Sequence, residues 1–133
     1  MYVRFLSPMR SRMRGVDYGI FQCAIKCRDD YRNPEYLRSA IREEINWYND
    51  NLPAPREGAF DVKSRKRMIN VGICWFMSDA DEMVRRAYAL RALLAECGYA
   101  IVKKGTKQPG QILYRDNYQI VAKPFESTPT LWG

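Results

Sequence analysis

The feature that most constrains the fold of this chain is an apolar run at residues 71–77, Val-Gly-Ile-Cys-Trp-Phe-Met. A strand with one solvated face alternates apolar and polar side chains, whereas a strand covered on both faces is apolar throughout. Such a strand must lie inside a sheet, with other elements packed against it. The run therefore predicts a central strand around which the rest of the chain is arranged.

An amphipathic helix is predicted on each side of this strand in the sequence. The stripe before it recurs at intervals of three or four residues and predicts a helix over residues 34–52. That stripe consists of Leu37, Ile41, Ile45, Tyr48 and Leu52. After the strand, Ser78 is a candidate N-cap, and a second apolar stripe leads to Gly98, which suits the C-terminal end of a helix.

The remaining segments complete an α+β domain. Further strands are expected at residues 2–6, 99–103, 111–115 and 118–123, a further helix at 18–28, and a long exposed loop at 53–70. We therefore predict a single α+β domain over residues 1–125 and a tail over 126–133. The domain has two layers, with a mixed sheet of four or five strands and about three helices mainly on one face.

The predicted order is β-α-α-β-α-β-β-β, and the central strand–helix–strand unit is expected to be a right-handed crossover between parallel strands. No segment approaches the roughly 20 apolar residues that span a bilayer, and the N-terminal sequence lacks the apolar core of a signal peptide. We therefore expect a cytoplasmic protein with no membrane partner. The oligomeric state is left open.

The chain contains no histidine. This excludes every mechanism that requires a histidine base and removes the commonest metal ligand. The carboxylates form no convincing catalytic pair. Glu43 and Glu44 are adjacent on the predicted helix, so they diverge around it, and the acids after Ser78 suit the positive end of a helix dipole. We expect neither a catalytic residue nor a cofactor, although an enzyme that uses Lys, Tyr or a carboxylate stays an alternative.

Four cysteines, Cys23, Cys27, Cys74 and Cys97, lie inside apolar segments. A reduced cysteine in such a segment behaves as a small hydrophobic residue. Cys23 and Cys27 could share one helix face, but the other two form no second pair, and structural zinc sites usually use closely spaced pairs. Core packing is therefore favoured over a metal site or a reactive thiol.

The net charge is +7, and the excess lies in connecting segments and at the two ends rather than in the predicted helices. Loops expose their side chains, so the basic segments predict a surface that attracts anions. A phosphate site in residues 103–110 is disfavoured, because this basic stretch lacks the spacing of a phosphate-binding loop. The candidate anion- or nucleic-acid-binding residues are Arg10, Arg12, Arg14, Lys63, Arg65, Lys66, Arg67, Lys103, Lys104 and Lys107.

Several stretches resemble a group of small bacterial proteins of unknown function. They include residues 72–76, 109–116 and 119–124, together with 19–22 and 51–55. The shared pattern is one of strands, turns and helix ends. The resemblance implies no activity, cofactor or catalytic residue for this chain.

Three functions are consistent with these observations. The first is a non-catalytic binding module for an anionic partner, with nucleic acid as the leading candidate. The second is a protein-interaction adaptor or inhibitor carried on a mobile element, for which Trp47 or Trp132 could anchor the interface. The third is the small enzyme that works without histidine. The anion-binding prediction depends on the basic segments meeting on one face.

Overall fold

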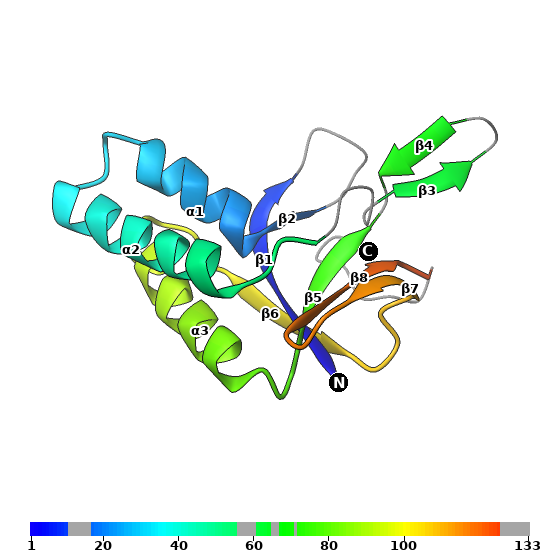
Figure 1. Ribbon diagram of the computed structural model, residues 1–133. Coiled ribbons are helices and arrows are strands. Elements are labelled where there is room, and N and C mark those ends of the chain that lie inside the picture. Colours follow the sequence, from blue (N-terminus) through cyan, green and yellow to red (C-terminus); the bar gives the residue numbers. More distant parts are fainter. Residues whose placement is uncertain (11–16, 56–60, 65–66, 71, 126–133) are drawn as a thin grey trace.

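The computed structural model describes residues 1–10, 17–55, 61–64, 67–70 and 72–125, and for residues 9, 10, 17, 18, 61–64 and 67–70 it describes the backbone alone (Figure 1). The described elements, in chain order, are β1 (Tyr2–Arg10), β2 (Asp17–Gly19), α1 (Ile20–Asp29), α2 (Glu35–Asn51), β3 (Asp61–Ser64), β4 (Arg67–Asn70), β5 (Ile73–Met77), α3 (Asp81–Glu96), β6 (Val102–Thr106), β7 (Gln111–Arg115) and β8 (Gln119–Lys123). This arrangement confirms the α+β class and the predicted order of the main elements.

Five strands form the body of the sheet in the order β6-β1-β5-β8-β7. The short strand β2 pairs with the second half of β1, on the side opposite β6. Leu6 of β1 is paired with Gly19 of β2 on one side and with Val102 of β6 on the other. Every pairing between described strands is antiparallel. The expectation of a mixed sheet was therefore wrong. Helix α3 does connect two strands of the same direction, β5 and β6, but β1 lies between them and is antiparallel to both.

The three helices cover one face of the sheet (Figure 1). The apolar stripe predicted for residues 34–52 points into the core, since Leu37, Ile41, Ile45 and Tyr48 are buried on α2. The Tyr48 hydroxyl donates a hydrogen bond of 2.6 Å to the Met83 carbonyl, which joins α2 to α3. Helix packing against the sheet thus accounts for the main hydrophobic core.

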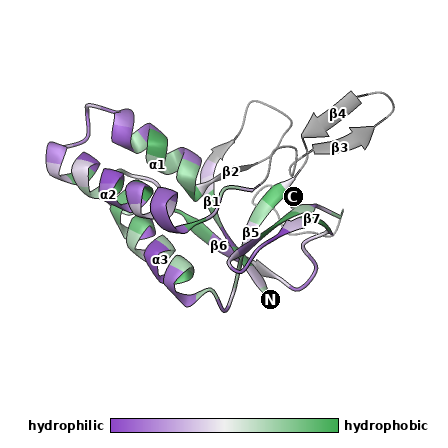
Figure 2. Cartoon of the chain, viewed as in Figure 1, coloured by the Kyte–Doolittle hydropathy of each residue, from purple (hydrophilic) through white to green (hydrophobic). Residues whose placement is uncertain are grey.

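Strand β5 carries buried side chains on both of its faces, as its apolar sequence predicts, and Figure 2 shows it in the colour of hydrophobic residues. Phe76 packs against the helices, whereas Trp75 belongs to a second apolar cluster on the opposite face of the sheet. We call this opposite face the outer face. Its cluster contains Ile73, Trp75, Ile120 and Ala122, with Tyr2 and Met77 packed against them.

Several boundaries differ from the sequence-based prediction. Strand β1 continues past Pro8, because its second half pairs with β2 through an irregular register. The segment predicted as a loop at 53–70 contains the hairpin of β3 and β4, in which Val62 is paired with Ile69. This hairpin projects from the end of β5 (Figure 1). Strand β6 lies three residues beyond its expected start.

Two glycines adopt conformations that require glycine. Gly98 has a φ of 93° just after α3, as its position in the sequence predicts. Gly110 has a φ of 122° in the turn before β7, and a Cβ atom added there would lie 1.8 Å from the carbonyl oxygen of Lys123. The close approach of this turn to the end of β8 therefore depends on Gly110.

No helix in the described part of the chain combines the length and apolar character needed to cross a lipid bilayer.

Candidate anion-binding face

Three of the ten predicted binding residues have described side chains, and they do not point the same way. Lys103 and Lys104 are neighbours on β6, so strand alternation sends them to opposite faces of the sheet. The Lys103 ammonium lies 5.3 Å from the centre of the Tyr88 ring on α3. Lys104 is half-buried on the outer face, and Lys107 is exposed just after the strand.

The side chains of the other seven residues lie outside the described part of the structure. Arg12, Arg14, Arg65 and Lys66 lie outside the described residues. Arg10 has a described backbone at the end of β1, and Lys63 and Arg67 have described backbones on the β3–β4 hairpin. Convergence of these basic segments on one face therefore stays a prediction.

The sheet instead brings together basic residues that the sequence did not single out. Arg4 on β1 is directly opposite Lys104 on β6. On its other side, Tyr2 is paired with Met77 and Val3 with Phe76, so Arg4 falls next to Trp75 on β5. Trp75 is in turn paired with Ile120 on β8, and Ile120 with Arg115 on β7. We call this set of five residues, Lys104, Arg4, Trp75, Ile120 and Arg115, the transverse row.

The transverse row has a basic edge on each side of an apolar centre. Trp75 and Ile120 are buried, with 1% and 0% of their surface exposed. Arg4 and Lys104 are half-buried and Arg115 is exposed. Because the apolar centre is buried, a negatively charged ligand can contact only the basic side chains at its two edges.

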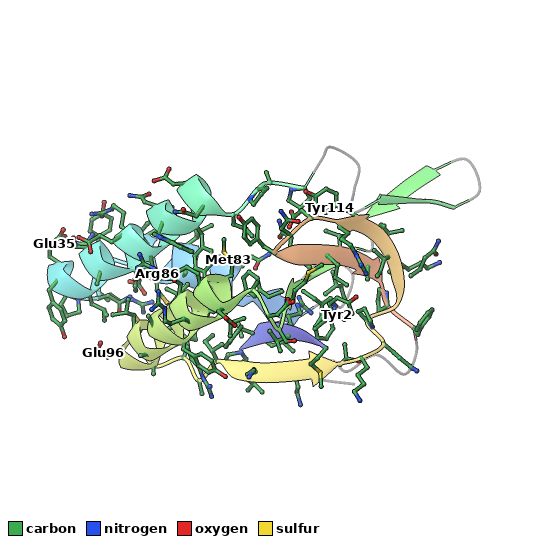
Figure 3. All side chains as sticks on the ribbon, turned by 60° about the horizontal axis from the view of Figure 1, so that its bottom comes forward. Tyr2, Glu35, Met83, Arg86, Glu96 and Tyr114 are labelled. Atoms are coloured by element: carbon green, nitrogen blue, oxygen red, sulfur yellow. The ribbon has the colours of Figure 1, made fainter. Side chains whose placement is uncertain are left out.

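Arg115 reaches back across the sheet to Tyr2. Its Nη2 atom donates a hydrogen bond of 3.0 Å to the Tyr2 hydroxyl, although β5 and β8 lie between the two strands. Figure 3 shows Tyr2 and Tyr114 on opposite sides of the β7–β8 ribbon. Tyr2 is half-buried beside the apolar cluster, so the hydrogen bond holds an aromatic ring next to the transverse row.

The Trp75 side chain carries a buried polar atom on the outer face. Its Nε1 is buried and has no hydrogen-bond partner among the described residues. A buried donor without an acceptor costs about 1–3 kcal/mol. Within the described part of the chain, the outer face thus contains an indole N–H without an acceptor.

Charge is distributed unequally between the two layers. In the helical layer, residues 19–55 and 78–101 carry eight basic and ten acidic side chains. In the strand layer, residues 1–8, 72–77 and 102–125 carry one acidic side chain, Asp116, and six basic ones. These six are Arg4, Lys103, Lys104, Lys107, Arg115 and Lys123. The positive charge of the described residues therefore lies on the strand layer.

The Asp116 carboxylate stabilises the turn between β7 and β8. Its carboxylate accepts hydrogen bonds from the Tyr118 and Gln119 backbone N–H groups and from the side chains of Tyr114 and Gln119. Burial raises the pKa of Asp116, but the hydrogen bonds from Gln119, Tyr118 and Tyr114 outweigh it and lower the pKa overall. The single acid of the strand layer thus stabilises a turn.

Gln119 extends this network into the core. Its amide donates to the Pro53 carbonyl at 2.6 Å, and its carbonyl accepts a hydrogen bond from the Cys74 thiol at 3.0 Å. Burial raises the pKa of Cys74 to about 12. The thiol is therefore protonated at neutral pH and acts as a hydrogen-bond donor, not as a nucleophile.

The other cysteines also pack as the sequence predicts. Cys23 and Cys27 are buried on α1, Cys97 is half-buried at the end of α3, and burial raises the pKa of all three thiols. Among the described residues, no group of three or more histidine, cysteine, aspartate or glutamate side chains is arranged to hold a metal ion.

Two further sequence-based candidates have ordinary structural roles. Glu43 and Glu44 diverge as expected, since Glu43 is exposed and Glu44 forms an ion pair of 3.0 Å with Arg86 on α3. Residues 103–106, part of the basic stretch weighed as a phosphate loop, belong to strand β6. Neither feature adds to the transverse row.

Comparison with known proteins finds no matching protein-family model, no similar curated protein and no similar solved structure.

Proposed function

We propose that this protein is a non-catalytic binding module for an anionic partner and that the partner is a nucleic acid. The carrying observation is the charge of residues 1–8, 72–77 and 102–125, the part of the strand layer whose side chains are described, where six basic side chains accompany one acid, Asp116, that stabilises a turn. A layer with this imbalance attracts polyanions, and clustered arginine and lysine side chains are the electrostatic feature typical of nucleic-acid-binding proteins.

The position of Arg4 and Lys104 supports the same proposal. The two side chains start from directly opposite positions on neighbouring strands, so one phosphate bound between them would contact two cations at once. Arginine and lysine also provide complementary phosphate contacts, one as a fork of N–H donors and the other as a compact charge.

A salt titration tests the proposal. Binding of the full chain to random single-stranded and double-stranded oligonucleotides should weaken steeply as salt rises, with a slope of about −0.7 to −0.9 per phosphate contact in a plot of log affinity against log salt. The absence of binding to either oligonucleotide at low salt would rule out the proposed function.

A matched pair of variants locates the binding layer. Lys104→Ala combined with Lys107→Ala removes two charges from the strand layer, and should lower both the affinity and the salt slope. Lys26→Ala combined with Arg42→Ala removes two exposed charges from the helical layer, and should leave both unchanged. Equal losses in the two variants would indicate general attraction by net charge alone.

A second candidate function is supported by the turn between α1 and α2. Tyr31 in this turn and Tyr36 at the start of α2 expose 83% and 68% of their surface, and exposed tyrosines are typical anchors of protein interfaces. Trp47, which the sequence analysis considered for this role, is half-buried. The Arg86 guanidinium carbon lies 4.6 Å from the centre of its ring. A protein-interaction module would capture partners from a bacterial lysate that survive nuclease treatment and are lost with Tyr31→Ala and Tyr36→Ala.

The proposed function also implies a compartment. The four cysteines are free and buried or half-buried, and thiols persist in this form where the environment is reducing. We therefore place the proposed binding in the cytoplasm.

A further inference from the structure

We propose that the transverse row, with Tyr2, is a site for one nucleotide of a single strand, in which the phosphate lies between Arg4 and Lys104 and the base stacks on Tyr2. This inference rests on the proposed function and specifies its site and its ligand. The occupant is single-stranded nucleic acid, and duplexes and polyphosphate are outcomes of the test below.

The spacing along β1 fits one nucleotide. Tyr2 and Arg4 are two residues apart on the same face, so their Cα atoms are about 7 Å apart. This is the scale of the separation between the phosphate and the base of a nucleotide. The side chains of Arg4 and Lys104 begin about 5 Å apart across the strand pair, so one phosphate can contact both.

The apolar part of the site favours a base over a bare phosphate. Tyr2 packs against the cluster that contains Trp75 and Ile120, and it is only half-buried. Stacking on such a ring tolerates any base, because every base has a π-face. A duplex offers its bases already stacked on each other, whereas a single strand can place them on the protein.

Arg115 acts on this site as a positioning residue. Its hydrogen bond of 3.0 Å to the Tyr2 hydroxyl fixes the phenol ring from the far side of the sheet. A ring held in place loses less conformational freedom when a base stacks on it. The exposed guanidinium also adds positive charge at the second edge of the transverse row.

The decisive experiment compares two ligands and two variants of Tyr2. The ligands are a single-stranded oligonucleotide and an inorganic polyphosphate of equal charge, measured at one salt concentration. Tyr2→Ala should weaken oligonucleotide binding about 5-fold to 100-fold, the range for loss of one stacked base, and should leave polyphosphate binding unchanged. Tyr2→Phe keeps the ring and should bind the oligonucleotide within about twofold of the unsubstituted protein.

The basic end of the row gives the complementary result. Arg4→Ala with Lys104→Ala should weaken binding of both ligands and reduce the salt slope of each. Arg115→Ala should weaken oligonucleotide binding more than polyphosphate binding, because it frees the Tyr2 ring. If it weakens both ligands equally, Arg115 acts only as a charge, and its positioning role is overturned.

A measurement without substitution keeps the test decisive if Tyr2→Ala does not fold. A single-stranded oligonucleotide that contains 5-bromouracil should crosslink on irradiation to the peptide that contains Tyr2, as read by mass spectrometry. Crosslinks confined to other peptides would overturn the site.

The failures of the two proposals are distinguishable. If the unsubstituted protein binds no polyanion, the proposed function fails. If it binds oligonucleotides but Tyr2→Ala binds them equally well, or if a duplex binds more tightly than the single strand, the proposed function stands and the nucleotide site is overturned.

Discussion

Arg4 and Lys104 lie directly opposite each other on the antiparallel strands β1 and β6, so two positive side chains share one cross-strand position. The arrangement adds positive charge to the outer face and also places two like charges directly opposite each other. Like charges at such positions destabilise a strand pair by a few tenths to about 1 kcal/mol. The proposed phosphate contact and the expected repulsion therefore involve the same pair of residues.

The first prediction is that Lys104→Glu stabilises the fold while it weakens binding of polyanions. Replacing the repulsion with an attraction should raise the free energy of unfolding by about 0.5–1 kcal/mol at low salt, and the gain should shrink as salt screens the pair. Urea denaturation measures the stability. Lys107 lies beyond the end of β6. As a control, Lys107→Glu makes the same charge change and should not stabilise the fold.

The second prediction concerns the unpaired indole nitrogen of Trp75. Trp75→Phe removes apolar surface but also removes a buried donor that lacks a partner, so the two effects oppose each other. We expect the free energy of unfolding to change by less than about 1.5 kcal/mol. Trp75→Ala should cost about 3–5 kcal/mol, because it leaves a cavity. If the two variants lose equal free energy of unfolding, the indole N–H does bind an acceptor in solution.

The third prediction is a pH dependence of stability that depends on Asp116. Its pKa is lower in the folded protein than the value near 3.9 of an unfolded chain. The stabilisation is therefore complete above about pH 4 and is lost as the pH falls through the lower folded pKa. Asp116→Asn should flatten the fall in stability below pH 4, as measured by urea denaturation.

The fourth prediction compares the two glycines that have positive φ. Gly110→Ala would place a Cβ atom 1.8 Å from the Lys123 carbonyl oxygen, so the turn must move. It should lower the free energy of unfolding by more than about 2 kcal/mol. A Cβ at Gly98 has no heavy atom within 4 Å, so Gly98→Ala should cost only about 1–2 kcal/mol of backbone strain. Thermal or urea denaturation of both variants would show the difference.

The parts of the fold that depend on local patterns were predictable from the sequence. The stripe on α2 and the apolar strand β5 each follow from periodicity within one segment. The β3–β4 hairpin was missed because its strands are four residues long and its sequence is dominated by charges. Its pairing of Val62 with Ile69 gives too little alternation to stand out.

For the candidate site, the sequence predicted only the positive charge and not the residues that lie together. Lys104 was expected to bind anions, but Arg4 and Arg115 are isolated basic residues that no local pattern marks. Their relation to Trp75 depends on the registers of three strand pairs, β1–β5, β5–β8 and β7–β8. The hydrogen bond between Arg115 and Tyr2 joins residues 113 positions apart. No local sequence pattern indicates such a contact.

The fifth prediction concerns the cysteine thiols and tests the alternative of an enzyme that uses a thiol. Burial raises the pKa of Cys27 above that of an ordinary thiol and raises the pKa of Cys74 to about 12. Because the thiolate is the reactive form, alkylation by iodoacetamide at pH 8 should be far slower in the folded protein than in denaturant for both residues. A rise to pH 9, which ionises most of an ordinary thiol, should leave these two slow. Mass spectrometry of the modified peptides gives each rate, and rapid modification of Cys74 in the folded protein would return a thiol nucleophile to consideration.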